Sequence, residues 1–202
     1  MKEVFRNYYD NKIKLEKWQI VSLVCFIIAI SGFFGFVYEY IFYYFNGGME
    51  RFYWRGGNFL PWINMYSIGA FIILFTSYRF RNSPLKVFLI SALFTGLFEL
   101  ISGFILDYFF HHRYWNYSNE FLNIHGYTCL LTMICFGIGG LLLMYIIIPF
   151  LVKMSKKTPK KMFLTISIVL CSIILVDEIY NFLFTKIFDV PRAIDIYKHM
   201  KF

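Results

Sequence analysis

The residues of this sequence with the greatest chemical potential are carboxylates that lie inside long apolar segments. They are Glu39, Glu99, Asp107, Asp177 and Glu178. A carboxylate in hydrocarbon costs a few kcal/mol, so it is usually paired or lines a polar cavity. Gly32 and Gly35 share a helical face with Glu39, and small residues let helices approach closely. We therefore expect these acids to face neighbouring helices rather than lipid.

Three arginines in the connecting segments are the expected partners of these acids: Arg51, Arg55 and Arg113. The planar guanidinium group binds a carboxylate through two N–H groups. Two interpretations stay open. The pairs could form a structural network that holds the helices together, or they could line a water-accessible polar cavity open to the outer face.

A second concentration of polar and aromatic side chains lies in HHRYWNYSNEFLNIHG, residues 111–126. A metal site at His111, His112 and His125 is weakly supported, because adjacent histidines rarely bind one ion. No G-x-S-x-G or HExxH pattern indicates a nucleophile or a metalloprotease. Asn123 fits a helix cap and Gly126 a close contact in the first turn that follows. The residues expected to line the cavity are Glu39, Arg55, Glu99, Asp107, Arg113, Trp115, Tyr117 and Asn123.

The composition indicates that these side chains are carried by membrane-spanning helices and their connecting segments. Of 202 residues, 59% are hydrophobic and 16% charged, whereas soluble domains carry about 25% charged residues. Apolar runs long enough to span a bilayer recur along the chain. They predict one all-α membrane domain over 1–202, with five spans at 18–45, 60–78, 84–110, 125–152 and 162–188. Tryptophans near the span ends suggest an interfacial belt: Trp18, Trp54, Trp62 and Trp115.

Basic residues predict the orientation of these spans. Five Lys and Arg residues lie in 1–17, three in 79–86 and five in 153–161, against seven in the remaining segments. Because basic residues concentrate on the cytoplasmic side, the N-terminus is predicted inside and the C-terminus outside. The segments 46–59 and 111–124 then lie on the outer side of a multi-pass protein of the cell membrane.

The same observations exclude several classes of function. The net charge of +8 is explained by membrane-flanking loops, so we expect no nucleic-acid partner. The cysteines are Cys25, Cys129, Cys135 and Cys171, and their unpaired spacing within apolar stretches is typical of small core residues. No metal or other cofactor is expected. No GxxxxGK[ST] phosphate loop is present, so any ATP that drives this protein must bind to another chain.

Three sequence blocks carry a family resemblance. The first is GFVYE at 35–39, followed by Arg55-Gly56 and LPWINMYSIGA at 60–70; the second is 99–107. The third is RYWNYSNEFLNIHG at 113–126, which continues through Cys129-Leu130 to Pro149. On these blocks, the sequence resembles the CmpB-like family of type IV ABC-transporter membrane proteins over residues 30–150. Asn116 and His125 depart from the family's usual Asp and Asn, and Asn64–Ser67 replaces its PIYG turn, so the outer cluster has one acid fewer.

Three classes of function remain open. The resemblance implies a permease-like transporter subunit, with an outer polar cavity for a small or lipid-like substrate and a separate ATPase subunit. The short cytoplasmic links, such as 153–161, leave little room to dock that ATPase. The second class is a small enzyme or binding protein that acts on a lipid or lipid-linked substrate at the outer leaflet. The third is a structural or regulatory subunit. Membrane lipids and further copies of the chain are expected partners.

Overall fold

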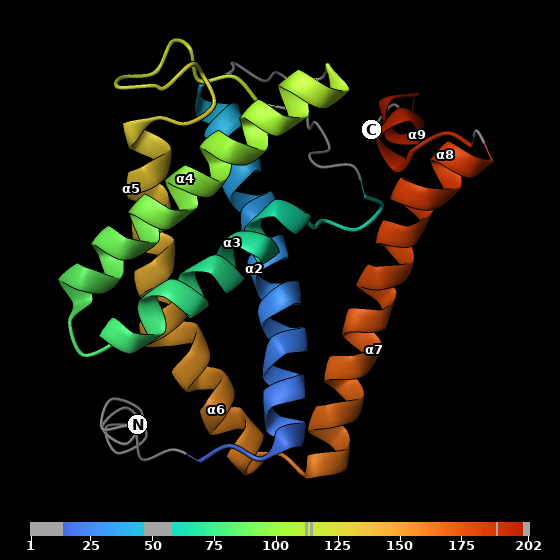
Figure 1. Cartoon of the computed structure of the whole chain (residues 1–202). Helices are drawn as coiled ribbons and strands as arrows, with labels where there is room; N and C mark the ends of the chain where they lie inside the picture. The colour runs from blue at the N-terminus through green and yellow to red at the C-terminus, as the bar shows by residue number, and fades with distance from the viewer. Residues whose placement is uncertain (1–13, 47–57, 112, 114, 189, 200–202) are drawn as a thin grey trace. The chain divides into compact units, whose positions relative to one another are not determined.

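The computed structural model describes residues 14–46, 58–111, 113, 115–188 and 190–199 (Figure 1). Over these residues the chain is helical and contains no strand. The helices are α2 (Lys17–Asn46), α3 (Asn64–Ser77), α4 (Pro84–Phe110), α5 (Leu130–Leu142), α6 (Ile148–Lys157), α7 (Lys160–Ile179), α8 (Thr185–Ile187) and α9 (Ala193–His199). The all-α prediction is therefore confirmed.

Four helical stretches of the described chain are long and apolar enough to cross a membrane. They are Lys17–Phe42, Pro84–Phe109, Leu130–Lys157 and Lys160–Ile179. The predicted second span corresponds to α3, which has 14 residues. At 1.5 Å per residue it reaches about 21 Å, less than the roughly 30 Å of hydrocarbon. The chain is a membrane protein, and the fifth crossing stays a prediction.

The predicted third span, 84–110, coincides with α4, and Pro84 occupies its first turn, where a missing N–H costs nothing. The fourth span was expected to begin at His125 and end near Pro149. Its helix begins instead at Leu130 and continues through Pro149 to Lys157. A π-helical turn at Leu143–Ile147 precedes the proline, which cannot donate an N–H to the ordinary helical ladder.

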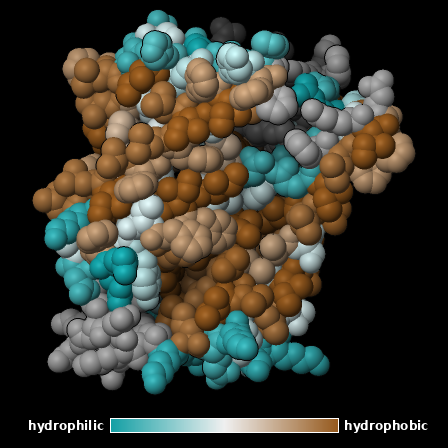
Figure 2. Space-filling model, in the orientation of Figure 1, coloured by the Kyte–Doolittle hydropathy of each residue, from teal (hydrophilic) through white to brown (hydrophobic). Residues whose placement is uncertain are grey.

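The described chain divides into two compact units, and the first contains residues 69–150. Glycines let its helices α4 and α5 pack closely: Gly96 meets Met133, and Gly137 meets Phe88. The opposite side of α4 exposes large apolar side chains, which form a continuous hydrophobic strip in Figure 2. They include Leu85, Leu89, Leu93, Leu97, Ile101 and Phe104. Such a face suits contact with lipid.

The second unit contains residues 14–68 and 151–202, with α2 packed against α7. A non-helical segment, 58–63, lies against the middle of α2: the Trp62 indole donates to the Ile28 carbonyl (3.1 Å) and the Ile63 N–H to the Gly32 carbonyl (3.1 Å). Trp62 is only 6% exposed. Its assignment to an interfacial belt was therefore wrong, because Gly32 leaves room for the ring against α2.

A buried carboxylate of α7 satisfies the backbone of this segment. Asp177, 7% exposed, accepts the N–H groups of Phe59 (3.0 Å) and Leu60 (2.8 Å). The Asn181 amide also donates to it, at 2.7 Å. The carboxylate thus supplies acceptors to amides that no helix or strand pairs.

Replacing Asp177 with Ala should therefore destabilise the protein. Two half-buried backbone N–H groups would lose their acceptor, at a cost of about 1–3 kcal/mol. Thermal unfolding in detergent would measure this loss. Asp195→Ala provides the control, because Asp195 pairs with Arg192 at an exposed site, where an ion pair contributes less than about 1 kcal/mol. Equal melting temperatures for the two variants would contradict the role of Asp177.

Candidate functional site

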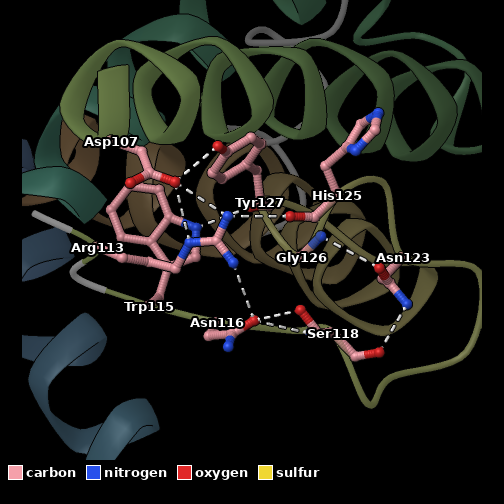
Figure 3. Close-up of polar contacts among 9 residues, drawn as sticks. All are labelled: Asp107, Arg113, Trp115, Asn116, Ser118, Asn123, His125, Gly126 and Tyr127. Atoms are coloured by element: carbon pink, nitrogen blue, oxygen red, sulfur yellow. Dashed lines mark hydrogen bonds and ion pairs between the residues drawn. The ribbon is translucent and has the colours of Figure 1, made fainter. Parts of the chain in front are cut away.

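The segment between α4 and α5, residues 111–129, folds back on itself (Figure 3). The Tyr117 N–H donates to the Gly126 carbonyl (2.9 Å), and the Trp115 indole donates to the Tyr127 carbonyl (2.7 Å). An isolated bridge pairs Ile124 with Thr128. These bonds hold the first half of the segment against the second, so we call residues 111–129 the folded loop.

An ion pair fixes the folded loop to the end of α4. The Nη2 and Nε atoms of Arg113 lie 3.0 and 3.3 Å from Asp107 Oδ2, and the Tyr127 hydroxyl donates to the same oxygen at 2.8 Å. The guanidinium carbon lies 4.6 Å from the centre of the Tyr127 ring, within the range of a cation–π contact. The Tyr127 side chain, and after it Asp107, raise the pKa of Arg113 further above its usual value. The predicted pairing of an apolar-segment acid with a loop arginine is confirmed.

Further contacts of Arg113 are made within the folded loop. Its guanidinium donates to Asn116 Oδ1 at 3.4 Å and to the His125 carbonyl at 3.3 Å. Asn116 Oδ1 also accepts the Ser118 N–H (3.0 Å) and hydroxyl (2.6 Å). An aspartate oxygen at this position could accept the same bonds. Arg113 therefore organises the loop through most of its N–H groups.

Left-handed backbone makes the turn of the folded loop. His125 has φ of 51° and Gly126 has φ of 73°. A Cβ on Gly126 would lie 2.5 Å from Ser118 Oγ and 2.7 Å from Asn116 Oδ1, so this position requires glycine. His and Asn are among the residues that tolerate positive φ, which accounts for His125 where the family has Asn.

Asn123 was expected to cap the fourth helix, and this was wrong. Its amide nitrogen donates to the carbonyls of Ser118 (3.1 Å) and Glu120 (2.9 Å), and its oxygen accepts the Gly126 N–H (3.1 Å). The helix begins later because the chain must first complete this turn. Cys129 is the residue before the helix, and its N–H donates to Thr132 Oγ1 at 3.3 Å.

Glu99 lies on α4, eight residues before Asp107, and is 7% exposed. The Tyr117 hydroxyl donates to Oε1 at 3.1 Å, and the Thr132 hydroxyl contacts Oε2 at 2.9 Å. The folded loop therefore touches both acids of α4, through Arg113 at one and Tyr117 at the other. Tyr127 and Thr132 were not predicted as site residues, although Tyr127 directly follows the loop motif.

The remaining predicted residues are placed differently. Glu39 belongs to the other compact unit, where the Tyr66 hydroxyl lies 3.4 Å from Oε1. Arg55, like Arg51 and His112, falls outside the described residues. Within the part of the chain that the structure describes, no group of three or more His, Cys, Asp and Glu side chains could hold a metal ion.

An open hollow borders the ion pair. Its lining residues are Phe104, Asp107, Tyr108, His111 and Tyr127. His111 ends α4 in a left-handed conformation, with φ of 49°. Three aromatic rings thus surround one carboxylate at the end of a membrane-spanning helix.

Together these features define an all-helical membrane protein whose folded loop closes one end of the α4–α5 pair. The chain belongs to the family described as "Putative ABC-transporter type IV", whose model matches residues 24–182. That match includes the folded loop, Glu99, Asp107 and Asp177. Neither a curated protein nor a solved structure matches the chain.

Replacing Gly126 with Ala should destabilise the folded loop. The added Cβ meets the Ser118 and Asn116 side chains, and a non-glycine residue at positive φ costs about 1–3 kcal/mol. Gly139→Ala is the matched control, because a Cβ there meets nothing within 4 Å and alanine favours a helix by up to about 1 kcal/mol. Thermal unfolding compares the two, and hydrogen exchange locates the change. Equal exchange of residues 113–128 in both variants would contradict this assignment.

Proposed function

We propose that this chain is the membrane-spanning subunit of a transporter and that a separate polypeptide supplies the ATPase. In this proposal, the folded loop and the end of α4 form a substrate-recognition site on the outer face. The observation that carries this proposal is the hollow beside the Asp107–Arg113 pair, on a chain of an ABC-transporter family. The substrate is small or lipid-like, because the hollow opens beside the lipid-facing strip of α4.

The lining of the hollow supports a substrate that has both an apolar part and a cationic group. Oδ2 of Asp107 takes the bonds from Arg113 and Tyr127. Oδ1 accepts no hydrogen bond from the described residues, so it is available to a ligand. Phe104, Tyr108 and Tyr127 present the aromatic surfaces that attract ammonium groups.

The non-helical segment supports a chain that crosses the membrane five times. Residues 58–63 lie beside the middle of α2, and α3 follows directly. A broken crossing, non-helical first and helical afterwards, would then return the chain to the inner side. Non-helical backbone is tolerated at membrane depth where protein buries it, and Asp177 meets that requirement here. Broken helices of this kind are frequent in transporters.

The link between α6 and α7 is too short to supply a docking helix of its own, but its charge offers a surface to an ATPase subunit. The two helices meet at Thr158-Pro159, flanked by Lys156, Lys157, Lys160 and Lys161. With the N-terminus inside, this basic corner lies in the cytoplasm. A partner with an acidic surface would complement it, while further copies of the chain could bury the apolar helix faces.

One observation favours a different function, that of a structural subunit without a substrate. Arg113 uses most of its N–H groups on Asp107, Asn116 and His125, and so has little capacity for a ligand. An enzyme or binding protein that acts on a lipid headgroup would use the same hollow as a transporter. The experiments below separate a ligand site from a loop that only closes the helix pair.

Asp107→Asn should abolish the binding of ammonium-bearing ligands. Choline and lysophosphatidylcholine should raise the melting temperature of the wild-type protein in detergent, because a ligand at 100 times its Kd adds about 2.7 kcal/mol. The neutral analogue 3,3-dimethylbutanol should not. Asp195→Asn changes a carboxylate that pairs with Arg192 and is not among the residues lining the hollow, so this variant should respond like the wild type. Equal shifts in Asp107→Asn, or no shift with either ammonium ligand, would argue for the structural role.

Single cysteines in a cysteine-free background should report the orientation. Asn119 and Lys157 are both exposed, one on the folded loop and the other at the basic corner. An impermeant maleimide added to intact cells should label Asn119→Cys and spare Lys157→Cys until the cells are permeabilised. The reverse pattern would invert the topology, and labelling of both would refute it.

A further inference from the structure

Glu99 differs from the other acid of α4 because no cation compensates it. It is 7% exposed, and no Lys, Arg or His of the described residues lies within ion-pair distance of its carboxyl group. Its hydrogen-bond partners are the hydroxyls of Tyr117 and Thr132. An ionised carboxylate in such surroundings is costly, so the protonation state of Glu99 has to be found from the hydrogen bonds around it.

The hydrogen atoms available at Thr132 decide that state. Thr132 Oγ1 lies 2.9 Å from Glu99 Oε2 and 3.0 Å from the Cys129 carbonyl oxygen, and it accepts the Cys129 N–H at 3.3 Å. A threonine hydroxyl carries one hydrogen. If Glu99 were ionised, the Thr132 hydrogen could be donated either to Glu99 Oε2 or to the Cys129 carbonyl, but not to both. The remaining contact would then place two oxygen atoms together without a hydrogen between them.

A proton on Oε2 removes this conflict. The Glu99 carboxyl group then donates to Thr132 Oγ1, and the Thr132 hydroxyl donates to the Cys129 carbonyl. The Tyr117 hydroxyl still donates to Oε1, at 3.1 Å. Every short contact around Glu99 then contains one hydrogen, as a fully satisfied buried network requires.

Thr128 provides a second, independent observation. It is 2% exposed and near enough to interact with the Glu99 carboxyl group, yet no partner among the described residues meets its hydroxyl at hydrogen-bond geometry. A buried hydroxyl without a partner is costly. It is also a donor that can turn to Glu99 once the carboxyl group loses its proton. The site thus contains the groups needed to stabilise either state of Glu99.

We propose that Glu99, Tyr117, Thr128 and Thr132 form a proton-binding site inside the membrane, occupied by a proton in the state described here. On release, the O–H bond of the Glu99 carboxyl group breaks and the proton passes to a water molecule on the side of the folded loop, which leaves a carboxylate and a hydronium ion. Tyr117 belongs to the folded loop and donates to Glu99, so movement of the loop would open this route. The use of the proton to couple transport rests on the proposed function, but the protonation itself does not.

Other titratable groups near Glu99 are few. The folded loop contributes Tyr117, and the start of α5 contributes Cys129, whose thiol contacts Thr132 Oγ1 at 3.7 Å. On α4 itself, Asp107 is the next acid, and Arg113 forms its ion pair with Asp107 and not with Glu99. None of these supplies a positive charge to Glu99, so an ionised state has to be stabilised by hydroxyl donors.

Infrared difference spectroscopy on the full chain in liposomes tests the site. At neutral pH the wild-type protein should show the carbonyl stretch of a protonated carboxyl group, which alkaline buffer converts into carboxylate bands. Glu99→Gln should lack this band, whereas Asp107→Asn should retain it. A neutral-pH spectrum in which Glu99→Gln removes only carboxylate bands would overturn the proposal.

Two further variants keep the test decisive if Glu99→Gln folds poorly. Thr132→Val removes the acceptor of the carboxyl hydrogen, so the band should shift to higher frequency, and Thr132→Ser should restore it. An unchanged frequency in Thr132→Val would count against the site. The ammonium-ligand experiment stands apart: a wild-type protein that binds neither ammonium ligand but shows the carbonyl band would contradict the proposed function and leave the proton site standing.

Discussion

The architecture depends on one constraint, that polar groups within a bilayer must find partners inside the protein. Asp177 meets this constraint for the amides of Phe59 and Leu60, which lie beside the middle of α2 without a helix of their own. The carboxylate gains hydrogen bonds and the backbone gains acceptors, so neither is left unsatisfied. This exchange allows a non-helical segment to precede α3 where a continuous helix would otherwise be needed.

The sequence predicted the helices well where apolar length alone determines them. The bounds of α4 were found to the residue, since Pro84 and the polar loop at 111 mark both ends. The start of α5 was misplaced by five residues, because the left-handed turn at His125-Gly126 uses residues that also suit a helix start. Hydropathy could not reveal the non-helical segment, since Trp62 and its neighbours are apolar whether they are helical or not.

The sequence predicted several residues of the candidate site, but it predicted fewer of the side chains that contact them. The pairing of an apolar-segment acid with a loop arginine followed from charge alone, and Asp107 with Arg113 satisfies it. Tyr127 also donates to Asp107, but this contact could not be predicted from charge. It depends on the fold of the loop, which brings the Tyr127 hydroxyl to an acid twenty residues earlier in the chain. Glu99 was expected near the same cations, yet its partners come from hydroxyls on Tyr117 and Thr132.

Depth along α4 explains why its two acids are compensated differently. Glu99 precedes Asp107 by eight residues, or about 12 Å of helix. Asp107 lies near the helix end, where an arginine from the loop reaches it and both side chains remain about one-third exposed. At Glu99 an arginine would have to leave water entirely, at a cost that an ion pair often fails to repay. The hydroxyls from α5 and the loop are uncharged, so burying them does not require the desolvation of a charge. A protonated, uncharged carboxyl group at Glu99 can exchange hydrogen bonds with them.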